Sequence, residues 1–362
     1  MEDLAGVMTL RNRKILVTGH TGFKGSWMSL LLNKFENELF GFALPPDSKH
    51  GIFRAAKVNK LFSKSIYGDV RNLKELEKFF KSSKPEIVFH FAAQPLVSNS
   101  YLKPRDTIET NILGTANLLD CVRKYQTAKL VVIVTSDKCY LEDQSKEPLV
   151  ESSSLGGNDV YSASKACQEL IAQSYSKSFL RHEGISLITV RAGNVIGGGD
   201  WSPNRLIPDL MRALRNNAVI EIRHPDAVRP WQHVLEPIFG YLRAAEYSLE
   251  KKPGILDSWN FGPSPRDEVP VSSIIKIFSK FSRLPKTVQN KSLHFDENPY
   301  LALDSSKAFN ELNWLPRWNL ETAVNESILW YQAEIEGQNM FHFSQEQIVK
   351  YSACEKRINF EN

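Results

Sequence analysis

The sequence predicts an α/β fold in which a doubly wound parallel sheet carries a smaller C-terminal lobe. Two observations predict it. Short apolar runs rich in Val, Ile and Phe alternate with stretches long enough for helices, a pattern typical of parallel strands joined by crossover helices. After about residue 193 the composition changes to segments rich in Gly, Pro, Trp and Arg, such as "GGGDWSPNRLIP", which indicate the loops of a separate lobe.

The expected strands are short, continuous apolar runs, which suit burial on both faces of a sheet. They lie at residues 14–19, 38–44, 65–69, 86–93, 129–136, 186–193 and 258–262. The helices between them are expected near residues 25–35, 73–82, 107–125 and 160–180. Two later helices, "DSSKAFNEL" and "LETAVNESILWYQAEI", each open with a capping-type residue. Three tryptophans are expected to pack in the core: Trp314, Trp318 and Trp330.

The totals exclude several classes of protein. The chain has 362 residues, 42% hydrophobic and 24% charged, which is ordinary for a globular protein of one large or two coupled domains. A net charge of +4 without a long basic block does not favour nucleic acid as a partner. Four scattered cysteines predict reduced thiols, and no metal-ligand cluster is visible. With neither a signal peptide nor an 18-residue apolar run, we expect a cytoplasmic protein that binds no membrane.

The first strand leads into Gly19-His20-Thr21-Gly22-Phe23-Lys24-Gly25, a G-x-x-G-x-x-G spacing. Glycines allow a tight turn here and let backbone N–H groups approach a pyrophosphate at a helix N-terminus. Because the turn follows an apolar strand and opens a helix, it predicts a Rossmann-type dinucleotide site. We expect residues 1–193, rejoined by about 234–262, to form this domain. The second lobe would then comprise 194–233 and 263–337, and we assign no role to the tail at 338–362.

The residues alone do not decide which nicotinamide cofactor binds. The second strand ends in "GFALPPD", with no acid until Asp47 to hold ribose hydroxyls and no arginine to take a 2′-phosphate. Asp69, after the third strand, has two interpretations: a contact to adenine, or a cap for the helix that begins near Asn72. His90 lies within an apolar strand and is expected to be a core histidine with satisfied hydrogen bonds.

A catalytic group is predicted by Tyr161 and Lys165, which are four residues apart and therefore share one face of a helix. A lysine ammonium at that position is expected to lower the pKa of the phenol and make it a usable base near neutral pH. Ser136 ends the apolar run "KLVVIVTS" and would hydrogen-bond the same substrate hydroxyl.

In chain order, the glycine loop, the strand-end serine and the Tyr/Lys pair resemble the extended short-chain dehydrogenase/reductase superfamily. Its sugar-nucleotide 4,6-dehydratases carry two acids, or an acid and a lysine, directly after the strand-end Ser or Thr, whereas simple epimerases lack such a pair. Asp137 and Lys138 stand at these positions. The resemblance implies that Asp137, with a raised pKa, protonates the departing C6 hydroxyl. Lys138, with a lowered pKa, would remove the C5 proton.

A closer resemblance, to the CDP-glucose branch of these dehydratases, covers about residues 12–335. It rests on the motifs "VTGHTGFKGSW", "FAAQPLV", "TSDKCY", "RAGNVIGGGDW", "RLIPD", "RPWQHVLEP", "WNFGP" and "LDSSKA". It implies NAD as cofactor and a nucleotide sugar, CDP-glucose, as substrate. The implied reaction is oxidation at C4, loss of water across C5 and C6, and hydride return to C6. It also implies a homodimer or homotetramer formed through the helices near 107–125 and 160–180.

The resemblance also implies a role for each matching residue. The implied catalytic residues are Ser136, Asp137, Lys138, Tyr161 and Lys165. The implied cofactor contacts are Gly19, Thr21, Gly22, Phe23, Lys24, Gly25, Asp69, Val70, Phe91, Ala92 and Ala93. The implied substrate contacts are Gln94, Asn194, Arg205, Arg229 and His233.

Several alternatives stay open. Ser98 and Asn99 stand where the branch has two arginines, and residues 141–160 lack its aromatic-rich segment, so another nucleotide sugar is an alternative substrate. Arg205 and Arg229 have a second interpretation as partners in surface ion pairs. The rival functions are a nucleotide-sugar epimerase or reductase, which the Asp-Lys pair argues against, and a non-catalytic nicotinamide-binding protein, which has no need of the Tyr/Lys pair.

Overall fold

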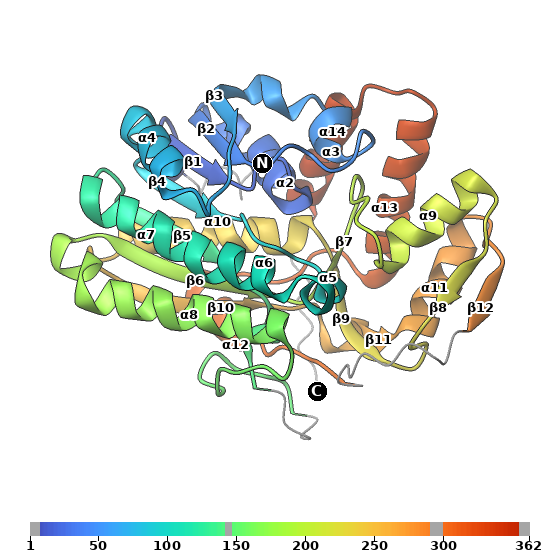
Figure 1. The fold of residues 1–362 in the computed structure, drawn as a ribbon. Coiled ribbons are helices and arrows are strands. Elements are labelled where there is room, and N and C mark those ends of the chain that lie inside the picture. Colours follow the sequence, from blue (N-terminus) through green and yellow to red (C-terminus); the bar gives the residue numbers. More distant parts are fainter. Residues whose placement is uncertain (1–7, 142–146, 290–299, 355–362) are drawn as a thin grey trace.

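Seven parallel strands form the central sheet of the computed structural model, which describes residues 8–141, 147–289 and 300–354 (Figure 1). The strand order is β10-β6-β5-β4-β1-β2-β3. The strands are β1 (Lys14–Thr18), β2 (Glu38–Ala43), β3 (Phe62–Tyr67), β4 (Ile87–His90), β5 (Leu130–Val134), β6 (Ser186–Ala192) and β10 (Leu256–Phe261). All seven predicted strands are therefore found in this sheet, including the late one at 258–262.

Helices cover both faces of the sheet, as a doubly wound fold requires. On one face α2 (Phe23–Leu32) and α10 (Leu235–Glu250) bury apolar side chains against alternate strand residues such as Ile15 and Val17. On the other face α4 (Leu73–Ser83), α7 (Gly114–Tyr125) and α8 (Val160–Ser178) pack against the residues between them, such as Leu16. Figure 1 shows α7 and α8 side by side along this second face. No helix within the described ranges is long and apolar enough to cross a bilayer.

Two of the differences between the predicted and observed element boundaries affect residues near the site. The third strand covers Phe62–Tyr67 rather than 65–69, so Gly68 and Asp69 lie in the loop after it. The helix expected at 107–125 is interrupted: α6 (Pro104–Ile108) is followed by a π-helical turn (Glu109–Leu113) and then by α7. Such turns are short insertions in α-helices and are frequent at functional sites.

The C-terminal part adds small sheets beside the carboxyl edge of the main sheet. One contains β7 (Asn194–Ile196), β9 (Val228–His233) and β11 (Glu268–Pro270), and the other pairs β8 (Ile220–Ile222) with β12 (Thr287–Gln289). The helices of this part are α9 (Leu206–Asn216), α11 (Val271–Phe281), α12 (Ser306–Leu312) and α13 (Leu320–Ile335). The three tryptophans predicted to lie in the core, Trp314, Trp318 and Trp330, are all buried.

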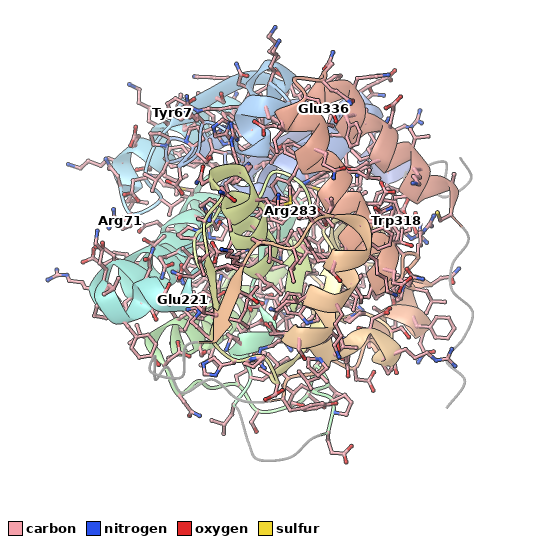
Figure 2. All side chains as sticks on the ribbon, turned by 90° about the vertical axis from the view of Figure 1, so that its right-hand side faces the viewer. Tyr67, Arg71, Glu221, Arg283, Trp318 and Glu336 are labelled. Atoms are coloured by element: carbon pink, nitrogen blue, oxygen red, sulfur yellow. The ribbon has the colours of Figure 1, made fainter. Side chains whose placement is uncertain are left out.

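The tail contains a structural helix that the sequence pattern did not reveal. Helix α14 (Met340–Ala353) packs on α2, α13 and the short α3 (Ile52–Ala55), and buries Met340, Ile348 and Tyr351 in the main core. In Figure 2, Trp318 lies beside these C-terminal helices, on the opposite side of the view from Glu221 of β8. Residues 355–362 lie outside the described part of the chain.

Candidate active site

The candidate site is a cavity of about 530 Å³ at the carboxyl edge of the main sheet. The strand order reverses there: the chain runs outward from β1 through β2 to β3, then returns to place β4 on the other side of β1. Open α/β sheets bind ligands in the crevice at such a reversal. The cavity is lined by the segments that follow β1, β4, β5 and β6, together with residues of β7, β8, β9 and α9.

The glycine turn after β1 has no room for side chains. Gly19 has φ +71°, and a Cβ there would lie 2.6 Å from the backbone nitrogen of Ala92. A Cβ on Gly25 would lie 2.3 Å from the carbonyl oxygen of Gly19. Gly22 is the N-cap of α2 and no side chain caps that helix, so the amides of its first turn remain available for an anion. This cradle fits the pyrophosphate of a dinucleotide.

The structure decides one of the two interpretations of Asp69. The N-cap of α4 is Asn72, whose side chain accepts a hydrogen bond from the amide of Glu75. Asp69 instead accepts two hydrogen bonds from the guanidinium of Arg71, at 2.6 and 2.9 Å. Partial burial alone would raise the pKa of this carboxyl, but the bonds to Arg71 outweigh it and the pKa is lowered. The capping interpretation is therefore wrong. Asp69 and Val70 both line the cavity, where Asp69 contributes a carboxylate.

Ser136, Asp137 and Lys138 line the cavity directly after β5. The Ser136 hydroxyl donates to Asp137 Oδ1 at 2.7 Å, whereas Asp137 Oδ2 is buried and has no hydrogen-bond partner among the described residues. Burial raises the pKa of Asp137, although the Ser136 bond and the charges of Lys138 and Lys24 oppose the rise. A raised pKa is the direction that a proton-donating carboxyl needs. Lys138 is half-buried beside it.

Tyr161 and Lys165 share one face of α8, as predicted. Asp159 caps this helix by accepting the amides of Tyr161 and Ser162, and the Lys165 Nζ lies 5.9 Å from the centre of the Tyr161 ring. The expected lowering of the phenol's pKa is not found. Burial raises the pKa of Tyr161 to about 12, partly offset by a hydrogen bond with Ser136.

The pKa of Lys165 is also shifted by its surroundings. Burial lowers the pKa of Lys165 to about 7, and the neighbouring charge of Lys24 lowers it further. Near neutral pH Lys165 is therefore only partly protonated. Its average positive charge attracts a phenolate less strongly than a full charge would. Its hydrogen bond is donated to Gln168 Oε1, at 2.8 Å.

Four further cationic residues line the same cavity: Lys24, Arg205, Arg223 and Arg229. Burial lowers the pKa of Lys24 to about 8, assisted by the charge of Arg205. Arg205 does form an ion pair, at 2.9 Å, but its partner Asp200 is buried and also lines the cavity, so this is not a surface pair. These cations are groups that could hold an anionic ligand in the cavity.

Two predicted substrate residues are not among those that line the cavity. The side chain of Gln94 is bonded to neighbouring protein groups instead. It donates to the hydroxyl of Thr107 on α6 and accepts from the amide of Leu96. His233 is buried against Trp27 and Trp318, and its Nδ1 accepts the amide of Leu235. The remaining predicted site residues, including Thr21, Phe23, Phe91, Ala93 and Asn194, all line it. No group of His, Cys, Asp and Glu in the described ranges could hold a metal ion.

Other cavity residues were not predicted. Asp200 stands in the "GGGDW" motif, which could have suggested it, whereas residues 220–224, in β8 and directly after it, carry no such signal. The two stretches that depart from the resembling branch lie elsewhere. Ser98 accepts a hydrogen bond from Asn204, and neither it, Asn99 nor any described residue between 141 and 160 lines the cavity.

Known proteins resemble this chain in sequence and in fold. The NAD dependent epimerase/dehydratase family matches residues 15–260. A CDP-glucose 4,6-dehydratase of Salmonella typhimurium is 40% identical over 353 residues, which cover 96% of this chain and 98% of that protein. Two solved structures share the fold. Epimerase Mth375 of Methanothermobacter thermautotrophicus has a TM-score of 0.81 at 20% identity and covers 93% of this chain and 97% of its own. MoeE5 in complex with UDP-glucuronic acid and NAD has a TM-score of 0.73 at 22% identity and covers 88% and 98%.

Proposed function

The chain belongs to the NAD-dependent epimerase/dehydratase family, and from this premise we propose that it is a 4,6-dehydratase that converts CDP-glucose to CDP-4-dehydro-6-deoxyglucose. NAD is the cofactor of the family. The observation that carries the proposal is the Asp137–Lys138 pair in the cavity that also holds Ser136 and Tyr161. An epimerase needs only the redox residues, whereas elimination of water needs an additional acid and base. The 40% identical relative supports the choice of CDP-glucose.

The cofactor would lie along the glycine turn, with its pyrophosphate over the start of α2 and its adenosine toward Asp69 and Val70. When bound, NAD would supply a hydride acceptor for C4 of the sugar and return that hydride to C6. Tyr161 would remove the proton of the 4-hydroxyl, with Ser136 bonded to the same oxygen. The raised pKa of Tyr161 means that this proton transfer requires stabilisation of the phenolate, which a fully charged Lys165 would provide.

Elimination would follow once C4 carries a ketone, because the carbonyl acidifies the proton at C5. Lys138 would take that proton as base, and would return a proton to C5 when the hydride reaches C6. Asp137, whose pKa is raised by burial, would give its proton to the leaving 6-hydroxyl. One water is lost and the sugar is left without net oxidation or reduction. The substrate diphosphate would lie toward Arg205 and Arg229, and Asn194 would contact the sugar nucleotide.

The test is incubation with CDP-, dTDP-, GDP- and UDP-hexoses, followed by detection of the 4-keto product and its mass. We expect loss of one water from CDP-glucose. Loss of water only from another nucleotide sugar would keep the reaction and overturn the substrate. Epimerised sugar without loss of water, or binding without turnover, would overturn the dehydratase proposal.

We also propose that the chain assembles as a homodimer or homotetramer. Large apolar side chains remain exposed on the surface formed by α6, α7, α8 and the turn between α6 and α7, among them Ile108, Leu113 and Leu170. An apolar pattern of this kind is also produced by packing inside a single chain, but these side chains are about half exposed here. Exposed apolar groups on paired helices favour burial against a second copy. The cytoplasmic location stays a prediction.

A further inference from the structure

Lys165 is connected to the protein interior by a chain of buried polar side chains. Its Nζ donates to Gln168 Oε1 at 2.8 Å, and Gln168 Nε2 donates to Thr115 Oγ1 at 2.8 Å. Gln168 and Thr115 are both fully buried. Because an ammonium has donors only, the oxygen end of the amide must face Lys165, and the orientation of the Gln168 side chain follows.

The next contacts hold that amide in place. The Thr115 hydroxyl donates to the carbonyl of Asn111 at 2.7 Å, so its oxygen is left to accept from Gln168. His90 Nε2 lies 3.1 Å from the same oxygen and therefore acts as a donor. Each of these groups has one role that is consistent with all of its partners.

This series of hydrogen bonds ends at Ala92, which lines the cavity. Burial lowers the pKa of His90 to about 3, assisted by the charge of Lys165, so the ring is neutral with its proton on Nε2. His90 Nδ1 accepts from the hydroxyl of Thr18 at 2.7 Å, and Thr18 Oγ1 accepts from the amide of Ala92 at 3.3 Å. The histidine predicted to be a satisfied core residue is confirmed as one, and it supports the residues that orient Lys165.

We propose that Gln168 is a positioning residue for Lys165: its amide oxygen holds the ammonium beneath the ring of Tyr161 and stabilises the charged form. Gln168 Oε1 is the one hydrogen-bond acceptor of Lys165 among the residues that the structure describes. A buried ammonium without an acceptor loses its hydration without compensation, which favours the neutral amine. The proposal rests on the redox role proposed above for Tyr161 and Lys165.

Other groups that face Lys165 also influence its pKa. Lys24, on α2, is a cation and opposes the charge of Lys165, whereas Glu169 on α8 favours it. Tyr161 lies over the ammonium from the same helix, and His90 on β4 is neutral. Gln168 is thus a neutral acceptor among these groups. Its replacement is expected to shift the pKa of Lys165 in a direction that depends on the new side chain.

The experiment measures the pH midpoint for chemical labelling of Lys165, read by peptide mass spectrometry on the whole enzyme without substrate. In Gln168→Leu the acceptor is removed, and we expect the midpoint to fall by about one pH unit, a tenfold change in the ratio of amine to ammonium. In Gln168→Glu the acceptor is kept and a negative charge is added, so the midpoint should rise. Gln173→Leu, a half-buried position on the same helix, should leave it unchanged.

The fall in Gln168→Leu would support the proposal, because loss of a residue that only fills space takes no acceptor from the ammonium. The rise in Gln168→Glu shows that the labelling responds to charge at this position. No fall in Gln168→Leu would overturn the proposal. If Gln168→Leu does not fold, Gln168→Met, which keeps the length of the side chain and lacks the amide oxygen, takes its place: a fall supports the proposal and any other result overturns it. Because labelling needs no turnover, it separates this proposal from the dehydratase function, which the sugar-nucleotide panel tests on the wild type.

Discussion

Asp137 and Lys138 are neighbours in the chain, but their surroundings differ. Asp137 is 4% exposed and one of its oxygens has no partner among the described residues, so a proton on it is favoured. Lys138 is half-buried at the edge of the same cavity. This difference in burial supports the assignment of Asp137 as the acid. In water a carboxyl passes its proton to an amine and leaves a carboxylate and an ammonium, and burial of Asp137 opposes that transfer.

Replacement of Lys138 tests the base directly. In Lys138→Ala we expect the rate of dehydration to fall by about 10²- to 10⁴-fold, the usual range for loss of a general base. The measurement is the rate of 4-keto-6-deoxy product formation in deuterated water, together with deuterium at C5. Lys129→Ala, an exposed lysine just before β5, is the matched control. Dehydration at the wild-type rate in Lys138→Ala would show that another group is the base.

At the scale of elements, the motif "RPWQHVLEP" performs two tasks. Its first half, on β9, places Arg229 and Trp231 in the cavity wall. Its second half, at the start of α10, contains the fully buried Glu236. The Glu236 carboxylate accepts the amides of Arg317 and Trp318 and the hydroxyl of Tyr351 on α14. The motif thus connects the wall of the binding cavity to helix α14, the last helix among the described residues.

Removal of this carboxylate should destabilise the protein. In Glu236→Ala two backbone amides and a phenol lose their acceptor in the interior, and we expect the free energy of unfolding to fall by about 3 kcal/mol. Urea denaturation measures it. Glu346→Ala, an exposed glutamate on α14, should change stability by less than about 0.5 kcal/mol. An equally small change in Glu236→Ala would mean that other contacts of α14, such as its apolar packing and the Lys350–Glu326 ion pair, are enough to hold it.

At the scale of the whole molecule, the cavity and the proposed subunit contact share one helix. The N-terminal turns of α8 carry Tyr161 and Lys165 into the cavity, while Leu170, 53% exposed, points outward from the next turns. Figure 1 shows α7 and α8 as neighbours along this outer side. A subunit contact here would therefore support the helix that positions the redox pair.

A charge placed on this surface should separate the subunits. We expect light scattering at micromolar concentration to give the mass of a dimer or tetramer for the wild type and of a monomer for Leu170→Glu, since a buried unpaired carboxylate opposes association. Val349→Glu, at an exposed position on α14, should keep the wild-type mass. A monomer mass for the wild type would contradict the proposed assembly.

Local pattern was enough to predict much of this protein. The apolar runs determined the seven strands, the glycine spacing determined the turn after β1, and the four-residue interval determined that Tyr161 and Lys165 share a face. Each depends on residues close together in the chain. The pKa of Tyr161, the pair between Arg205 and Asp200, the place of His233 and the function of α14 depend on burial and on partners far away in sequence. Only the tertiary structure decides these, because desolvation and charge proximity are properties of the packed chain.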